Sequence, residues 1–379
     1  MSNFIVLGDS AVHELLIGLS KPEIITFQHE LEKAMMHVSV GKESEYQPSP
    51  GIVNRPNGQV TLFRPFTSPE IVGAKLVVDS AAVQDTSGGG KGPSLQGIVA
   101  LCDSRGLPVG IINAEELTGY RTSLSAMIPY MWRRYSENIV VFGAGRQALW
   151  HIRLALALRG SEIKSITVVN RSEARARSLL SQVEEENRLH WKSSSKLDVL
   201  DTSQPGSDRR LELLLSDVDV VFCTVPSTSP IFPSRYIVGG PGRKRYPFIS
   251  AIGSWQPDMI ELDPEIIRHV VNSPEGYNPS GGSGGAIIVD DRKEVLIKAG
   301  EVIQSGISAS QMVEVGEVLN WRQGSHMEQA GGQEKLVGWL ETGFVVFKVI
   351  GVSITDLAAG KAILDLAKER GVGTAILDF

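Results

Sequence analysis

A glycine-rich segment in the middle of the chain has the residue types and spacing that bind a dinucleotide. Residues 143–148 read GAGRQA and fit the pattern G-x-G-x-x-G/A. In this pattern Gly143 permits a tight turn, Gly145 lets the backbone approach a pyrophosphate, and Ala148 lets the next helix pack closely on a sheet. The helix N-terminus then offers unpaired N–H groups to the phosphates. We therefore predict a dinucleotide site here.

The residues after the next expected strand indicate which dinucleotide binds. Residues 165–169 resemble a strand and are followed by Asn170, Arg171 and Ser172, with Arg175 one helical turn later. An acidic residue at this place would hold the ribose 2′-hydroxyl of NAD, whereas a guanidinium pairs well with a 2′-phosphate. The pattern favours NADP(H) over NAD(H). The alternative is that both arginines are solvated charges at the start of a helix.

Lys75 is a charged residue inside the apolar, strand-like run GAKLVV at 73–78. Two interpretations are open. A lysine on an edge strand protects the edge from aggregation. A lysine that faces a cleft is desolvated, and can then donate a proton or bind a carboxylate.

Three arginines are candidates for holding a carboxylate. Arg121, in LTGYRTS at 117–123, lies early in an expected helix; it is either part of the first turn or a bidentate clamp, with Thr122 near a cofactor phosphate. Arg55 and Arg64 flank a strand-like run at 60–63 and are either further clamps or surface charges.

The elements around these residues change character along the chain. Residues 139–186 alternate buried-type strands with helices, which predicts a parallel, doubly wound sheet. Residues 187–210 are polar and poorly patterned, and 272–285 and 322–335 are typical of loops. The expected elements are strands at 60–63, 74–78, 97–102, 108–113, 139–142, 165–169, 219–224, 248–252, 286–289 and 344–351, and helices at 22–36, 118–131, 147–158, 173–186 and 354–367.

The composition excludes several classes of protein. Of 379 residues, 42% are hydrophobic and 21% are charged, and the net charge is −6, which argues against nucleic acid as the main partner. No uncharged apolar run reaches the length of a membrane span, and the first residues do not resemble a secretion signal, so we expect a cytoplasmic protein. The histidines form no HxH or HExxH motif, and no metal site is predicted.

Taken together, these segments resemble the ornithine cyclodeaminase/mu-crystallin family. The matching segments are GAKLV at 73–77, LTGYRTSLSA at 117–126, VVFGAGRQALWH at 140–151, VVNRSEARA at 168–176, FCTVPSTSPIF at 222–232, IGSWQPDMIELD at 252–263, AGEVI at 299–303 and FKVIGVSITDLAAGKAI at 347–363.

The resemblance implies an α/β fold in which a Rossmann dinucleotide-binding domain is inserted into a smaller α+β substrate and dimerisation domain. We place the first part of that domain at 1–130, the NADP-binding domain at 131–335 and the return at 336–379. The family forms dimers, and a homodimer is therefore expected. Lys75 matches the active-site lysine and Arg121 the substrate-carboxylate arginine. Arg55 is the best match to the second arginine, with Arg64 competing.

Other matches concern the cofactor and the substrate pocket. Ile350 is expected near the substrate. The cofactor residues expected from the motif or the resemblance are Thr122, Gly143, Gly145, Arg146, Gln147, Ala148, Asn170, Arg171, Arg175, Thr224, Val225 and Gly253.

One departure from the family shapes the functional prediction. Ornithine cyclodeaminases carry an aspartate for the substrate's side-chain amine where this chain has Trp255. We therefore predict NADPH-dependent reduction of a ketimine, cyclic or formed from a 2-oxo acid, to an amino acid. The alternatives are cyclodeamination or dehydrogenation of an amino acid in the oxidative direction, and a crystallin-like protein that binds NADPH without turnover.

Overall fold

The computed structural model describes residues 4–79, 95–239, 245–273, 276–325, 331–377 and 379. Its chain divides into two compact units, Met1–Thr122 with Val352–Phe379 and Ser123–Gly351. The sequence predicts domain limits after residues 130 and 335, whereas the two units divide after Thr122 and Gly351. The second limit lies later in the chain because strand β14 (Val345–Lys348) pairs with β11 (Phe248–Ala251) of the second unit. The segment before residue 352 therefore belongs to the dinucleotide-type sheet.

The first unit contains one mixed sheet and the helices that cover it. Its strands are β1 (Phe4–Leu7), β2 (Gly51–Asn54), β3 (Val60–Thr67), β4 (Ile71–Asp79), β5 (Leu95–Asp103), β6 (Pro108–Asn113) and β15 (Thr374–Ile376). Its helices are α1 (Asp9–Ile17), α2 (Lys21–Ser39), the short 3₁₀ helix η1 (Glu43–Tyr46), α13 (Ser353–Arg370) and the first part of α3 (Ala114–Tyr130).

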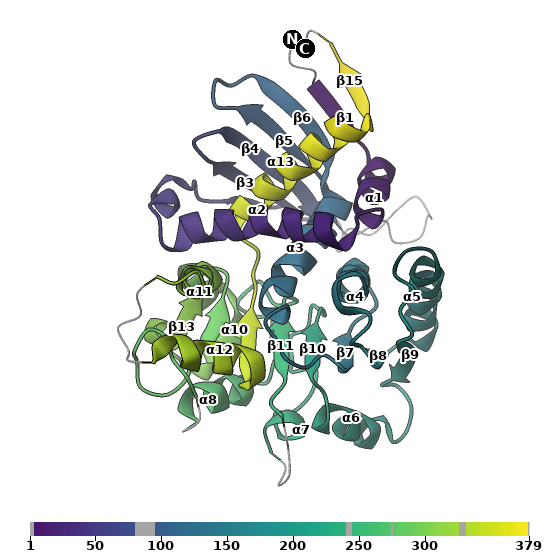
Figure 1. Ribbon diagram of the computed structural model, residues 1–379, viewed down its shortest axis with the longest axis vertical. Coiled ribbons are helices and arrows are strands. Elements are labelled where there is room, and N and C mark those ends of the chain that lie inside the picture. The colour runs from purple at the N-terminus through teal and green to yellow at the C-terminus, as the bar shows by residue number, and fades with distance from the viewer. Residues whose placement is uncertain (1–3, 80–94, 240–244, 274–275, 326–330, 378) are drawn as a thin grey trace. The chain divides into compact units, whose positions relative to one another are not determined.

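The described strands of this sheet lie in the order β15-β1-β6-β5-β4-β3-β2. Helices α2 and α13 pack together, and α13 crosses β3, β4 and β5 (Figure 1). The helix lies close to the sheet because Gly360 has no side chain; a Cβ there would come within 3.0 Å of Leu101 and 3.4 Å of Val99. This close approach places α13 directly over β5, the neighbour of β4 in the sheet.

The second unit is built on one parallel sheet. Its strands are β7 (Asn138–Phe142), β8 (Ser165–Asn170), β9 (Lys196–Asp201), β10 (Val220–Cys223), β11, β12 (Ile287–Val289), β13 (Met312–Glu314) and β14. Its helices, after the end of α3, are α4 (Arg146–Arg159), α5 (Glu173–Glu186), the π-helix η2 (Asn187–Trp191), α6 (Ser207–Ser216), α7 (Arg235–Val238), α8 (Pro264–Asn272), α9 (Arg292–Lys298), α10 (Gly300–Ser305), the 3₁₀ helix η3 (Ala309–Gln311), α11 (Val315–Arg322) and α12 (Gly332–Thr342).

The strand order of this sheet, β13-β12-β14-β11-β10-β7-β8-β9 in the described residues, confirms the predicted doubly wound fold. From β7 the chain proceeds outward to β8 and β9, and then returns to the other side of β7 with β10. Ligands of such sheets bind beyond the carboxyl ends of the strands, where the order reverses. Strands β7, β10, β11 and β14 are almost wholly buried, as helix-covered parallel strands require.

The polar stretch at 187–210, in which no element was predicted, contains regular structure. It holds η2, the strand β9 and the start of α6. Strand β9 lies at the edge of the sheet. The first three residues of its sequence KLDVLD are exposed or partly exposed, and the last three are buried. An edge strand needs no continuous apolar run, which is why the apolar pattern did not reveal it. The predicted loop at 322–335 likewise includes the start of α12.

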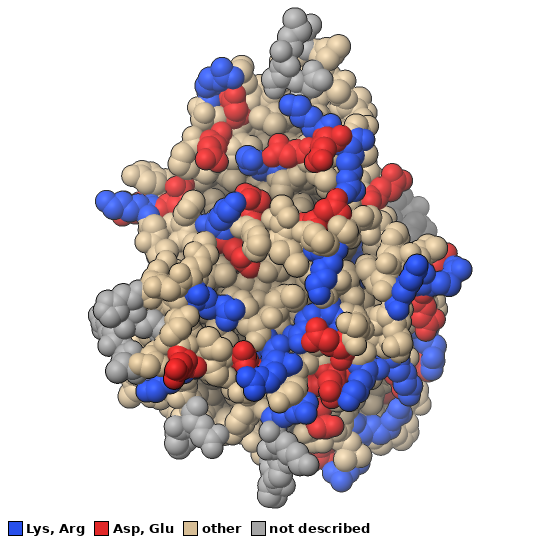
Figure 2. All heavy atoms as spheres, in the orientation of Figure 1, with Lys and Arg blue, Asp and Glu red and all other residues tan. Residues whose placement is uncertain are grey.

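Figure 2 shows one face of the molecule with its charged side chains coloured by sign. Acidic and basic side chains are intermixed over this face, often as neighbours. Exposed pairs such as Arg177 with Glu173 and Lys361 with Asp365 follow helical spacing. Such pairs add little stability and keep the local surface potential low.

Candidate functional site

Lys75 lies on an internal strand, which excludes the edge-strand interpretation. Strand β4 pairs with β3 on one side and β5 on the other, and Lys75 is in register with Arg64 and Val99. Its side chain points to the sheet face that α13 covers, and the residue is 3% exposed. A cation this deep needs a partner of opposite charge.

Asp356 of α13 is that partner, and it also binds Arg121. The Lys75 Nζ lies 2.7 Å from Asp356 Oδ2, and the Arg121 Nε donates to Asp356 Oδ1 at 2.8 Å. All three side chains are buried. We call Lys75, Arg121 and Asp356 the buried charge cluster. The sequence prediction missed Asp356, although an acid four residues before Gly360 on an apolar helix was a usable signal.

The cluster changes the acid strength of its members. Burial lowers the pKa of Lys75 to about 7, even though the Asp356 charge acts in the opposite direction. Burial alone would raise the pKa of Asp356, but the charges of Arg121 and Lys75 hold it below its ordinary value. Near neutral pH the cluster therefore contains an ionised carboxylate and a lysine that can gain or lose a proton.

The structure distinguishes the two candidates for the second arginine. Arg64 lies directly across from Lys75 in the β3–β4 register, and its charge contributes to lowering the Lys75 pKa. Arg55 is exposed in the turn between β2 and β3, where its backbone N–H donates to the backbone carbonyl of Gln59. Arg64, rather than the favoured Arg55, is therefore the arginine beside the cluster. Thr122 is buried one residue after Arg121.

The glycine loop of the second unit has the form that the motif predicts. Gly143 has φ 107°, and a Cβ there would lie 2.8 Å from Thr224 Oγ1. Gly145 precedes α4, and the described part of the chain places no atom within 4 Å of a Cβ built there, apart from the chain neighbours. The loop thus leaves space beside Gly145 at the N-terminus of α4, where a pyrophosphate would fit.

The residues after Gly145 begin α4. Arg146 is exposed at the first position, and Gln147 accepts a hydrogen bond from Ser123 Oγ at 3.3 Å. Ala148 is fully buried, which permits the close helix packing that the motif predicts. Thr224 at the end of β10 donates its hydroxyl to the Phe142 carbonyl at 2.7 Å and so ties β10 to β7 below the loop.

The end of β8 carries basic rather than acidic side chains. The Asn170 side-chain amide donates to the Ser172 backbone carbonyl at 2.9 Å. The Ser172 hydroxyl oxygen caps α5 by accepting from the backbone N–H of Arg175. Arg171 and Arg175 are both exposed. Two guanidinium groups thus stand beside the strand end where an adenosine ribose lies in Rossmann domains.

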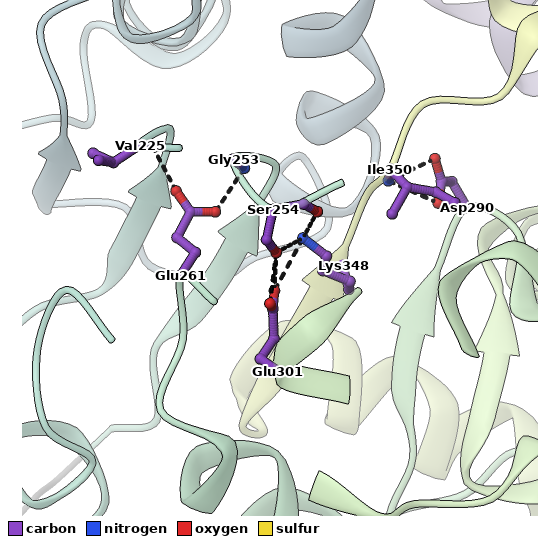
Figure 3. A network of polar contacts seen from close by, with 8 residues as sticks. All are labelled: Val225, Gly253, Ser254, Glu261, Asp290, Glu301, Lys348 and Ile350. Atoms are coloured by element: carbon purple, nitrogen blue, oxygen red, sulfur yellow. Dashed lines mark hydrogen bonds and ion pairs between the residues drawn. The ribbon is translucent and has the colours of Figure 1, made fainter. Parts of the chain in front are cut away.

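The next strand ends are fixed by buried carboxylates that the sequence prediction did not single out. Glu261 accepts from the N–H groups of Val225 and Gly253, each at 2.6 Å (Figure 3). A Cβ at Gly253 would lie 2.2 Å from the Val225 carbonyl, so no other residue fits. Asp290 accepts from the N–H of Ile350, the expected substrate-pocket residue. Burial raises the pKa of Glu261 to about 7 and that of Asp290 to about 6.

The described residues contain neither a candidate membrane span nor a candidate metal site. None of the helices in this part of the chain is long and apolar enough to cross a membrane. In the same residues, no three His, Cys, Asp or Glu side chains come together in a way that could hold a metal ion.

Comparison with known proteins identifies relatives of both units. The sequence pattern of the ornithine cyclodeaminase/mu-crystallin family matches residues 27–314. Ketimine reductase mu-crystallin of Mus musculus is 25% identical, over 72% of this chain and 70% of the relative. Thermococcus litoralis Δ1-pyrroline-2-carboxylate reductase, solved with NADH and L-proline, aligns with a TM-score of 0.71 at 19% identity, over 98% of this chain and 100% of the other. An archaeal alanine dehydrogenase dimer with bound NAD aligns with a TM-score of 0.71 at 20% identity, over 100% of both chains.

The buried charge cluster predicts how Lys75 responds to the loss of its partner's charge. The Asp356 charge raises the Lys75 pKa, so Asp356→Asn removes a stabilising anion and should lower that pKa further below about 7. Pulsed acetylation with acetic anhydride, followed by mass spectrometry across pH 5–10, gives the midpoint for Lys75.

The matched control is Asp365→Asn, which removes the partner of Lys361 on the same helix. This variant should lower the midpoint of Lys361 and leave that of Lys75 unchanged. A Lys75 midpoint that rises in Asp356→Asn, or that stays where it was, would contradict the assigned electrostatics.

Proposed function

Because the chain belongs to the ornithine cyclodeaminase/mu-crystallin family, we propose that it reduces a ketimine bearing a carboxylate to an amino acid, with NADPH as the hydride donor. Its general class is that of an NAD(P)-dependent oxidoreductase acting on carbon–nitrogen bonds, as the mouse ketimine reductase and the Thermococcus pyrroline-2-carboxylate reductase are. The observation that carries the proposal is the buried charge cluster with Arg64 beside it.

The charges of the cluster favour a second carboxylate. Arg64, Arg121 and protonated Lys75 carry three positive charges, and Asp356 supplies one negative charge. In a site of low dielectric constant, a substrate carboxylate would be attracted to these cations, because such pairing is strong there. Asp356 holds Arg121 by its Nε edge and so fixes the plane of the guanidinium. In this proposal Arg121 binds the substrate carboxylate and Arg64 adds to the attraction.

Lys75 is proposed as the group that moves a proton. Reduction of an imine adds a hydride to carbon and a proton to nitrogen. A lysine with a pKa of about 7 can donate a proton near neutral pH and recover it from water afterwards. Its ammonium can also contact the substrate carboxylate directly. Asp356 touches Lys75 and serves to orient it and keep it partly protonated.

The residues of the second unit fit the proposed cofactor. A nicotinamide dinucleotide bound at the glycine loop would supply the hydride. Gly143 and Gly253 each occupy places where a side chain would collide with neighbouring atoms, and Gly145 leaves open space above the start of α4. Arg171 and Arg175 are exposed after β8, and their guanidinium groups could pair with a 2′-phosphate. These features support NADP(H) as the preferred cofactor.

Trp255 bears on the kind of imine that is reduced. It lies partly buried in the loop after β11, at the place where ornithine cyclodeaminases carry an aspartate. An indole cannot accept a proton from an ammonium group. We therefore favour a cyclic imino acid, or an imine of a 2-oxo acid, without a charged amine in its side chain.

A homodimer is proposed from the exposed face of the first unit's sheet. Val53, Phe63 and Ile98 lie on the face opposite Lys75 and are 42%, 47% and 40% exposed. Leu76 lies between Phe63 and Ile98 in the sheet register. An apolar face of this kind is typical of a protein–protein contact, and a second copy of the chain would cover it.

Removal of the proposed carboxylate clamp gives a direct test of the function. Arg121→Ala should lower kcat/KM for Δ1-pyrroline-2-carboxylate by the equivalent of about 2–4 kcal/mol, because a buried charged contact is lost. NADPH oxidation at 340 nm reports the rate. Arg105→Ala, at an exposed arginine of the same unit, is the control and should retain the activity. Near-native kcat/KM in Arg121→Ala would show that the clamp is assigned wrongly.

The cofactor preference depends on Arg171 in this proposal. Arg171→Ala should weaken NADPH binding about tenfold, through loss of a charge-assisted contact, and leave NADH binding nearly unchanged. Isothermal titration gives both dissociation constants. Arg177→Ala, on α5 and paired with Glu173, is the control. An equal loss for both cofactors would rule out the 2′-phosphate contact.

The dimer proposal concerns the exposed sheet face. In size-exclusion chromatography with light scattering, the protein should show twice the chain mass of 41.0 kDa. Phe63→Lys places a charge on the apolar face and should give monomers, whereas Leu213→Lys, at an exposed leucine of α6, should not. A monomeric unmodified protein would refute this part of the proposal, as would a Phe63→Lys variant that stays dimeric.

A further inference from the structure

A buried lysine joins two strand ends of the second unit. Lys348 is the last residue of β14, and its Nζ donates to the Ser254 carbonyl at 2.7 Å and to the Ser254 hydroxyl at 2.6 Å (Figure 3). The same Nζ lies 3.0 Å from Glu301 Oε1. The Ser254 hydroxyl in turn donates to Glu301 Oε2 at 2.6 Å. All three residues are 0% exposed. We call them the lysine bridge.

The lysine bridge is one of three buried contacts that fix consecutive strand ends. Glu261 ties the loop after β10 to Gly253, the residue before Ser254. Asp290, after β12, accepts from the N–H of Gly351 at 2.7 Å, just beyond β14. The backbone beyond β10, β11 and β14 is thus held by ionisable side chains, most of which Figure 3 shows.

Stability alone is a weak reason for such an arrangement. Burying an ion pair costs desolvation energy, and a well-packed apolar set of similar volume is often equally stable. What an apolar set cannot do is hold a specific backbone carbonyl. The Lys348 Nζ donates to the Ser254 carbonyl, so the lysine bridge fixes the position and orientation of the loop after β11.

The position of the bridge in the sheet indicates what it serves. Strand β8, with Arg171 after it, lies on one side of β7, whereas β10, β11 and β14 lie on the other. A dinucleotide crosses such a sheet at the reversal of strand order, with one mononucleotide half on each side. If β8 receives the adenosine half, as proposed above, the strand ends held by the bridge lie on the side of β7 where the nicotinamide half would bind.

We propose that Lys348, Ser254 and Glu301 are positioning residues that fix the loops after β11 and β14 as the seat of the nicotinamide half of the cofactor. The inference rests on the proposed dinucleotide-binding function. It assigns these residues no contact with the substrate. Their effect passes through the backbone of Gly253 and Ser254.

Binding of the whole cofactor and of its adenosine half separates this role from a general structural one. The double variant Lys348→Met/Glu301→Met removes both charges and leaves neither of them unpaired. It should weaken NADPH binding about tenfold, the effect expected when a hydrogen bond to a charged group is lost. Binding of 2′,5′-ADP should stay within twofold of the unmodified protein, because its site lies across β7. Both are measured by isothermal titration.

A second variant and a control complete the experiment. Ser254→Ala retains both charges and should fold even if the double variant does not; it should change the NADPH to 2′,5′-ADP affinity ratio in the same direction. Lys298→Met/Glu294→Met removes a partly exposed ion pair on α9 and should leave the ratio unchanged.

The outcomes distinguish the two proposals. Selective loss of NADPH affinity in the bridge variants supports the positioning role. Equal weakening of both ligands, or no weakening of either, overturns that role while the dinucleotide site stands. If the unmodified protein binds neither NADPH nor 2′,5′-ADP, the proposed function fails and the inference fails with it.

Discussion

The ion pairs of Asp356 with Lys75 and Arg121 impose the main constraint on the first unit. Asp356 and Arg121 are 235 residues apart in the sequence, yet their side chains meet at 2.8 Å. The chain must therefore return to the first sheet after completing the second unit, and α13 is the segment that returns. Without Asp356 of α13, Lys75 would lose the anion that stabilises its charged form, at a cost of several kcal/mol for a buried charge. The pairing of these buried charges thus requires the first unit to be split in the sequence.

The same rule, that buried polar groups need partners, governs the second unit. Its strands are nearly all apolar, but their carboxyl ends expose backbone N–H and carbonyl groups that helices do not satisfy. Glu261 and Asp290 accept from those N–H groups, and Lys348 donates to a carbonyl. Each of these contacts holds a loop beyond the carboxyl end of a strand, the edge at which ligands of such sheets bind. In both units, then, charge is buried where the backbone or a side chain must be held in one place.

Much of the fold was predictable because it rests on local patterns. The alternation of apolar strands and helices from residue 139 to 186 predicted the parallel sheet, and the spacing of Gly143, Gly145 and Ala148 predicted the form of the loop. The edge strand β9 was missed because only its last residues are buried. The return to the first unit was placed too early because an apolar run such as 344–347 fits either sheet equally well.

The site was predictable in its parts but not in its pairings. A lysine inside an apolar run drew attention to Lys75, and the same signal at Lys348 in FVVFKVIG was not used. No spacing rule connects Lys75 to Asp356, because that contact depends on how α13 lies across β4. Arg55 and Arg64 flank the same strand, and only the register of β3 against β4 separates them.

Transfer of deuteride tests the central claim most directly. The protein is incubated with NADPH carrying deuterium at C4 of the nicotinamide and with Δ1-pyrroline-2-carboxylate, and the product is analysed by mass spectrometry. The account predicts proline with one deuterium on its α-carbon, formed when one of the two C4 positions is labelled and not when the other is. Proline without deuterium from either labelled cofactor would contradict this claim. So would the absence of any amino acid product from this imine and from related cyclic and acyclic ketimines.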